Sequence, residues 1–209
     1  LLIASIVSTA LFFAAAAAMR SYNQILSQNF ALAQLRGHHS IVETFVTRLV
    51  NNAGYQNFDN SFGNHAGCYL DASANGLSVA YDTLTGARER VELDLLSING
   101  LYRGFDAGNG VIEFSIFDWN SSSNQYIVRN RWGGPLVEQV EGFFVSADPG
   151  NCNPEFIVVG LLIRGREQIY RTARTQSFSS DYFSVPTVSS RHMHAYNEFL
   201  IAPKNIILK

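Results

Sequence analysis

The first nineteen positions of the chain, Leu1 to Met19, are apolar apart from Ser5, Ser8 and Thr9, and none of them is charged. Small hydroxyl groups of this kind can return a hydrogen bond to the backbone of their own helix. A helix of this length, with a rise of about 1.5 Å per residue, is just long enough to cross the hydrocarbon core of a bilayer. The pattern therefore predicts a helix that lies in lipid, or in an apolar environment that replaces lipid.

The helical pattern continues beyond this run. From Arg20 to Asn52 the chain contains no proline and one glycine, Gly37, and apolar residues recur every three or four positions in its second part. Such spacing indicates an amphipathic helix. We expect it to end at Asn51–Gly54, because glycine commonly follows the last helical turn. The whole helix, with a softer point around Gly37, would measure about 75–80 Å.

Two other interpretations of the apolar run compete with this one. A secretory signal peptide would place a basic stretch before the apolar core and a cleavage site in small residues such as Ala14–Ala18. A simple membrane anchor would give way to a linker after Met19. Neither needs a second, amphipathic half, so the continuation favours one long helix that occupies two different environments.

Strand patterns dominate the rest of the chain. Residues 54–75 are rich in Asn, Gly and Ser with scattered aromatic residues, which predicts a long ordered loop. Leu77–Tyr81 and Arg90–Leu95 alternate between apolar and polar residues on either side of a turn at Asp82–Gly86, which predicts a hairpin. A second hairpin is expected from two further runs, Val111–Phe117 and Gln125–Arg129, because Asp, Asn and Ser residues separate them.

The remaining segments complete the expected sheet. We expect Trp132–Pro135 to turn the chain and Leu136–Ser146 to continue as a strand. Phe156–Ile163 is almost continuously apolar, which is typical of a strand at the centre of a sheet. The tail from Tyr196 to Leu208 predicts one more strand pair around Pro203.

These elements predict an α+β fold in which a long N-terminal α-helix packs against a mainly antiparallel β-sheet. We expect two parts. Residues 1–53 form the helix, divided into an apolar half at 1–19, for lipid or an apolar environment that replaces it, and an amphipathic half at 20–53. Residues 54–209 form one β-rich globular domain.

Composition narrows the possible partners. Charged residues make up only 15% of the 209 residues and the net charge is −2, so the chain has no general electrostatic attraction for nucleic acid. A surface poor in charge also suggests burial against neighbouring molecules. A basic patch around Arg164, Arg166, Arg171 and Arg174 is the one feature in favour of nucleic acid, and solvent-facing arginines at strand edges explain it equally well.

Cys68 and Cys152 are the two cysteines of the chain. If the apolar start places the β-domain outside the cytoplasm, the oxidising compartment favours a disulfide between them. It would close a long loop and stabilise the domain by about 4 kcal/mol. The alternative is two unrelated buried thiols.

The sequence evidence for a metal site or a catalytic site is weak. His38–His39 on the helix cannot easily share a metal ion, and His192 with His194 would still need a third ligand. Asp118–Asn124 supplies oxygen ligands but lacks the glycine and distant glutamate of a calcium-binding loop. A Cys68–His65 pair would lose its thiol to the disulfide. With no G-x-S-x-G elbow and no phosphate-binding loop, we expect neither an enzyme nor a cofactor.

Several segments resemble the type IV pilin and pseudopilin superfamily. Leu1–Ala4 resembles the stretch that follows the invariant glutamate of the family's N-terminal processing motif, so we expect that glutamate and a short basic leader upstream. Leu49–Tyr55 resembles the helix-ending R-x-A-G-Y segment of PilW-like minor pilins, and Leu136–Phe143 resembles their L-V-E-x-V-E-x-L segment. Val158–Arg164 and Tyr196–Lys209 are similar to the strands that follow. The J-type pseudopilin of type II secretion shares this plan.

The resemblance implies a structural subunit of a type IV pilus or related filament. Such subunits wait in the inner membrane with a periplasmic domain, then join copies of themselves and other pilins, with the help of the pilus assembly machinery, in an extracellular surface filament. Small side chains allow close helix packing, and larger ones fill the gaps between helices. The residues that we expect in the filament core or membrane are Leu1, Leu2, Ile3, Ala4, Ile6, Val7, Ala10, Leu11, Phe12, Phe13, Ala14 and Ala15.

Two further roles remain open. The PilW-like segments favour a minor pilin or pseudopilin in a tip or priming complex. The aromatic loop Tyr55–Tyr69 suggests a membrane-tethered adhesin or binding module.

Overall fold

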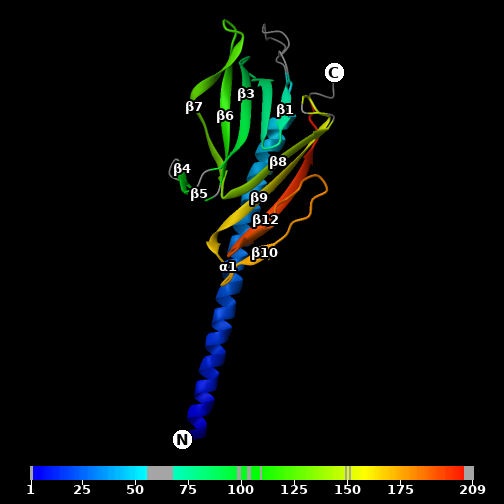
Figure 1. The fold of residues 1–209 in the computed structure, drawn as a ribbon. Coiled ribbons are helices and arrows are strands. Elements are labelled where there is room, and N and C mark those ends of the chain that lie inside the picture. The colour runs from blue at the N-terminus through cyan, green and yellow to red at the C-terminus, as the bar shows by residue number, and fades with distance from the viewer. Residues whose placement is uncertain are drawn as a thin grey trace.

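The computed structural model describes residues 2–55, 68–97, 100–102, 105–108, 110–148, 150 and 152–204. A single long helix projects far beyond a β-rich body, and the second half of that helix packs along the body (Figure 1). The fold is α+β with antiparallel sheets, as the sequence predicts.

Helix α1 (Leu2–Asn52) runs without a break through Gly37. Its docked face follows the predicted spacing, with Leu35, Val42 and Val46 fully buried against the sheets. The helix ends where predicted: Gly54 adopts a left-handed φ of 71°, and its N–H donates to the carbonyl of Ala80, 3.0 Å away.

A five-stranded antiparallel sheet covers the upper part of α1 in Figure 1, in the order β1-β2-β3-β6-β7. Both predicted hairpins are present in it, as the pairs β2–β3 and β6–β7. Alternate residues of its inner face, such as Leu77 and Leu93, enter the core, which explains why alternation located these strands. The strands are β1 (Leu70–Ser73), β2 (Gly76–Asp82), β3 (Arg88–Leu96), β6 (Val111–Asn120) and β7 (Gln125–Glu138).

A three-stranded sheet lies lower on α1, in the order β12-β9-β8. The apolar strand predicted at Phe156–Ile163 forms most of β9 and occupies the central position. The strands are β8 (Val140–Asp148), β9 (Phe156–Gln168) and β12 (His192–Ile201). Two short pairs complete the described strands: β4 (Gly100–Tyr102) with β5 (Phe105–Gly108), and β10 (Arg174–Gln176) with β11 (Val188–Ser190).

The turn predicted at Trp132–Pro135 is wrong, because β7 continues through these residues. Register shifts in the β6–β7 ladder on both sides of Gly133 mark local irregularity. Gly133 has a φ of 147°, and an added Cβ would lie 2.6 Å from the carbonyl oxygen of Phe114. Glycine here bends a continuous strand instead of ending it.

This geometry predicts that Gly133→Ala destabilises the protein by about 1–3 kcal/mol. The backbone conformation disfavours a side chain, and the new methyl group has no space beside Phe114. Urea unfolding of the full-length chain in detergent, followed by near-ultraviolet circular dichroism, measures the change. Gly134→Ala is the matched control, because a Cβ there meets no atom within 4 Å. Equal losses in the two variants would contradict the prediction.

The predicted strand Leu136–Ser146 is interrupted at Gln139, which separates β7 from β8. Gln139 adopts a φ of 62° and is buried, and its side-chain oxygen accepts a hydrogen bond of 2.7 Å from Arg164. The chain passes at this residue from the five-stranded to the three-stranded sheet. Alternation alone cannot show such a change of sheet, because apolar residues continue on both sides.

Two other boundaries differ from prediction. Leu70–Ser73 was expected to be loop but forms β1, since its main chain pairs with β2. The last described strand begins at His192 instead of Tyr196 and ends at Ile201, before Pro203. The second strand of the predicted tail pair lies outside the described residues.

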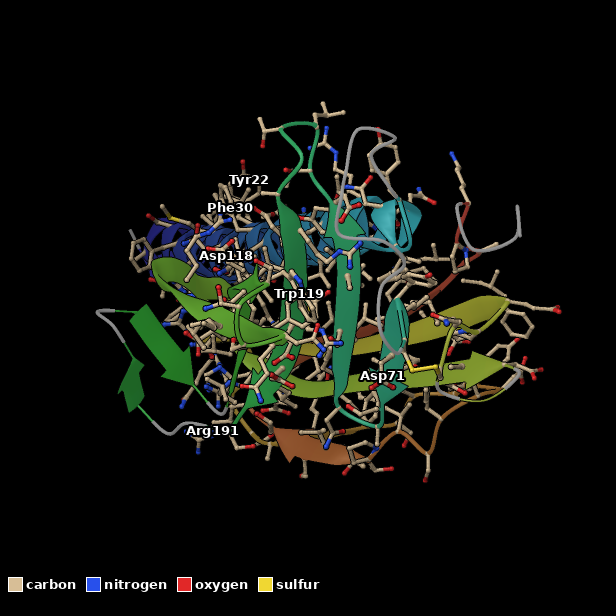
Figure 2. All side chains as sticks on the ribbon, turned by 90° about the horizontal axis from the view of Figure 1, so that it is seen from above. Tyr22, Phe30, Asp71, Asp118, Trp119 and Arg191 are labelled. Carbon is tan, nitrogen blue, oxygen red and sulfur yellow. A yellow bond between two sulfur atoms is a disulfide. The ribbon has the colours of Figure 1, made fainter. Side chains whose placement is uncertain are left out.

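A disulfide joins Cys68 and Cys152, whose Cα atoms are 5.2 Å apart and 84 positions apart in sequence. Cys152 also forms a β-bridge with Asp71, and Figure 2 shows the sulfur–sulfur bond close to that residue. The bond therefore ties β1, at the edge of the five-stranded sheet, to the loop between β8 and β9.

Candidate functional site

The projecting half of α1 is the most unusual surface of the molecule. Between Ser5 and Phe30 every side chain is exposed except Ala16 and Gln28, which are half-buried. The exposed side chains include large apolar ones, with Phe12 at 70% and Phe30 at 74% of their full accessibility. Soluble domains rarely leave a continuous apolar surface of this extent uncovered, so this half of the helix is the candidate interaction site.

The helix satisfies its own polar groups within the apolar run. The hydroxyl group of Thr9 donates a hydrogen bond of 2.8 Å to the carbonyl oxygen of Ser5, one turn earlier. The stretch from Ser5 is long and apolar enough to cross a bilayer, and the apolar window is not buried inside the protein. Its surface is thus compatible with lipid or with the apolar faces of other helices.

The structure places the predicted assembly residues on this projecting helix, without showing what they contact in an assembly. The exposed ones are Ile6, Val7, Ala10, Leu11, Phe12, Phe13, Ala14 and Ala15. Leu1 and the side chains of Leu2, Ile3 and Ala4 lie outside the described residues.

The helix docks on the body over only part of its amphipathic half. Tyr22 and Phe30 are still exposed, and the first buried residue is Ala31. The position facing Ala31 is Gly165 in β9, where an added Cβ would lie 3.9 Å from the Ala31 methyl group. The lower end of the three-stranded sheet therefore determines where docking starts, which the helix sequence alone cannot reveal.

Comparison with solved structures finds a type IV-like pilin from Thermus thermophilus with a TM-score of 0.54. The match covers 83% of this chain and 98% of that one, at 14% sequence identity. The chain has the fold of a type IV pilin. No family model and no curated protein matches the sequence.

The polar clusters considered from the sequence have other roles within this pilin fold. Asp118 binds Arg129, whose hydrogen bond holds the pKa of the Asp118 carboxyl below its usual range. The side-chain oxygen of Asn120 accepts hydrogen bonds from the N–H groups of Ser122 and Ser123, so this segment caps a turn. In the part of the chain that the structure describes, no cluster of three or more His, Cys, Asp or Glu residues is placed to hold a metal.

Three of the four arginines of the proposed basic patch have partners within the protein. Arg164 bonds Gln139 and lies 3.9 Å from Glu141, while Arg166 forms an ion pair with Glu138. The guanidinium of Arg174 lies 4.6 Å from the ring centre of Tyr170. The arrangement supports the interpretation of local contacts at strand ends.

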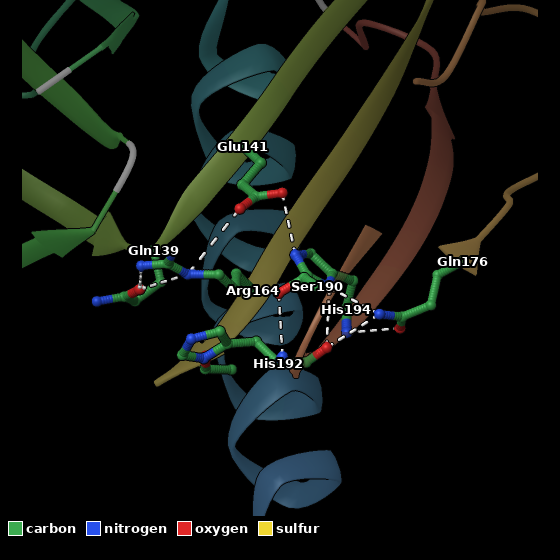
Figure 3. A network of polar contacts seen from close by, with 8 residues as sticks. Gln139, Glu141, Arg164, Gln176, Ser190, His192 and His194 are labelled. Atoms are coloured by element: carbon green, nitrogen blue, oxygen red, sulfur yellow. Dashed lines mark hydrogen bonds and ion pairs between the residues drawn. The ribbon is translucent and has the colours of Figure 1, made fainter. Parts of the chain in front are cut away.

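A buried polar network that the sequence did not predict ties the three-stranded sheet to the β10 segment (Figure 3). The Nε2 atom of His194 lies 3.0 Å from Glu141 of β8. Gln176 of β10 donates to the carbonyl of His192, and its side-chain oxygen accepts from the N–H of His194. The Nδ1 atom of His192 lies 2.9 Å from the carbonyl oxygen of Gly165, so the two imidazole rings have different partners.

The docked face of α1 also contains a buried imidazole, His39, well beyond the apolar run. Burial lowers the pKa of His39 below its ordinary value of 6.5, and the neighbouring His38 lowers it further. The unfolded chain therefore binds a proton before the folded chain does as the pH falls. Above pH 6.5 the ring is neutral in both the folded and the unfolded chain, and the folded protein has its full stability. As the pH falls below this value the folded protein loses stability, because the unfolded chain takes up the proton more readily.

We expect the thermal unfolding midpoint of the full-length protein to fall between about pH 7 and pH 5. The unfolding midpoint of the His39→Phe variant should fall less over the same pH range, because the variant has no titrating group at this buried position. Melting curves followed by near-ultraviolet circular dichroism at several pH values measure both slopes. Parallel slopes for wild type and variant would show that His39 does not contribute.

Proposed function

We propose that this chain is a structural subunit of a type IV pilus or a related pilin-like filament, which polymerises through its projecting helix. The observation that supports this most strongly is the uncovered apolar surface from Ser5 to Met19, attached to a pilin fold. Each subunit would keep this helix in the inner membrane, with the β-domain in the periplasm, until assembly transfers it to the core of an extracellular filament.

The transfer from lipid to a helical bundle depends on close packing, since lipid and protein are similarly apolar. Ala10, Ala14 and Ala15 offer small surfaces for approach, and Leu11, Phe12 and Phe13 offer large ones. Copies of this chain, other pilins and the assembly machinery are the partners that this mechanism requires. Neither a cofactor nor a catalytic residue has a part in it.

A minor pilin or pseudopilin at a tip or priming complex is the second candidate. The segment that resembles PilW-like pilins, Leu136–Phe143, contains the change of sheet at Gln139. The adhesin alternative depends on Tyr55–Tyr69, of which residues 56–67 lie outside the described part.

Immunogold electron microscopy of the surface filaments of cells that produce this chain distinguishes these roles. Labelling along the shaft supports a filament subunit, and labelling confined to the ends supports a tip subunit. Cells that export the chain but carry no label on any filament would overturn both.

A further inference from the structure

Strand β12 is the last strand of its sheet, and its backbone groups show which way its outer edge faces. The N–H of His194 and the carbonyl of His192 bond the side-chain amide of Gln176, at 3.0 and 2.9 Å, so both point away from β9 (Figure 3). Gln176 thus makes the pair of bonds, one donated and one accepted, by which the peptide groups of an added strand would pair with this edge.

The outer edge continues beyond the reach of Gln176. Because backbone direction alternates along a strand, the N–H and C=O groups of Tyr196, Glu198 and Leu200 face the same way as the N–H of His194. Among the described residues none of these outward groups has a backbone partner. From Ala195 to Ile201 the edge carries a single charge and no proline or lysine, the devices that commonly protect such edges.

A groove of about 360 Å³ lies between this edge and α1. Leu32, Leu35 and His39 contribute to its helical wall, and Ala195 and Tyr196 to its strand wall. The ring of Tyr196 packs on Phe144 at the other face of the sheet, so this residue borders the groove with its main chain. His39 is only 7% exposed, and neither of its ring nitrogens has a hydrogen-bond partner. Such an unsatisfied buried group is costly, and a polar group that enters the groove and pairs with the ring would lower that cost.

We propose that this groove binds an extended segment of another polypeptide, which adds to β12 as a further strand. Extended peptides bind in this way where an edge strand lies beside a helix or pocket: main-chain hydrogen bonds supply affinity and alternate side chains supply specificity. The amide group of Gln176 already occupies the first part of the same edge.

The charged residues that line the groove determine which side chains the bound segment should carry. Arg36 and Glu43 line it two helical turns apart, or about 10 Å, and two side chains four positions apart on one face of a strand, about 13 Å, reach both because Arg and Glu side chains are long. We therefore expect the segment to carry three side chains in order. An acidic side chain would face Arg36 and His39. An apolar one would face Leu32 and Leu35, and a basic one would face Glu43. Pairing of β12 with the β12 of a second copy is disfavoured, because a register centred on Glu198 opposes two like charges.

The test uses the full-length chain in detergent and two end-blocked, fluorescently labelled peptides, Thr-Glu-Thr-Val-Thr-Lys-Thr and its charge-reversed form Thr-Lys-Thr-Val-Thr-Glu-Thr. Fluorescence anisotropy measures binding, and hydrogen exchange measures protection of the Tyr196, Glu198 and Leu200 amides. We expect one charge order to bind and to slow exchange at these amides about tenfold or more.

Two controls separate strand addition from other binding. N-methylation of the peptide at alternate residues should weaken binding about tenfold for the set that faces β12, and much less for the other set. Glu198→Pro removes an outward N–H and leaves the ladder with β9 intact, so it should weaken binding similarly, whereas Glu198→Gln should not.

Absence of binding by both peptides, or equal binding by both methylated sets, would overturn the proposal. So would equal binding by Glu198→Pro and Glu198→Gln. Protection of the same amides that rises with protein concentration in the absence of peptide would assign the edge to a second copy of the chain instead.

Discussion

Replacing Ala10 with arginine will abolish incorporation of the chain into filaments while the β-domain remains folded. An arginine near the centre of a membrane helix costs about 2.5–3.5 kcal/mol on insertion, which corresponds to a decrease of about 60- to 300-fold in the equilibrium constant of insertion. The same charge would be unpaired in a filament core, where Ala10 leaves space for a neighbouring helix. Sheared surface filaments, quantified by immunoblot with an antibody against the β-domain, measure the loss.

Gln24→Arg is the matched control for this prediction. Gln24 is exposed on the same projecting helix, but it lies beyond the apolar run, next to polar residues such as Asn23. It should therefore tolerate the charge and assemble normally. Near-ultraviolet circular dichroism of both variants in detergent verifies that the β-domain is folded. Normal filaments from Ala10→Arg would contradict assembly through this helix, and loss from both variants would show that any added charge on the helix is harmful.

The elements that the sequence predicted correctly are those with a strong local pattern. Helix α1 has a sustained three-and-four spacing, the β2–β3 hairpin has clear alternation around a Gly86 turn, and β9 is continuously apolar because it is central and covered. In each of these cases the residues that form the element also carry the signal. The absence of proline from α1 likewise made its continuity predictable.

The features that could not be predicted depend on residues far apart in the sequence. The residues around Gly133 have the composition of a turn, but their pairing with β6 keeps the strand extended. The groove beside β12 exists because α1 and the edge strand come together, although 160 positions separate Leu35 from Ala195. Gln176 and His194 meet only after the β10–β11 segment folds back. The hydrophobic pattern within one segment cannot predict contacts between segments that are far apart in the sequence.

Removing the disulfide will cause the second large effect, a loss of about 4 kcal/mol in the free energy of unfolding. The bond closes a loop of 84 positions and holds β1 against the residues between β8 and β9. Breaking it increases the conformational freedom of the unfolded chain across all the strands of the five-stranded sheet. Urea unfolding of Cys68→Ser, Cys152→Ser and the double variant, in detergent and under identical conditions, measures the loss.

The three variants should lose similar amounts, because each breaks the same bond, and a reducing agent should bring the wild type to their level. Asn153→Ala provides the contrast. Its side-chain oxygen accepts hydrogen bonds of 2.7 and 3.1 Å from the N–H groups of Tyr69 and Leu70, so it ties the same two segments without a covalent bond. We expect it to cost about 1–3 kcal/mol. If Asn153→Ala matched the cysteine variants, local contacts rather than the closed loop would account for the stability of this junction.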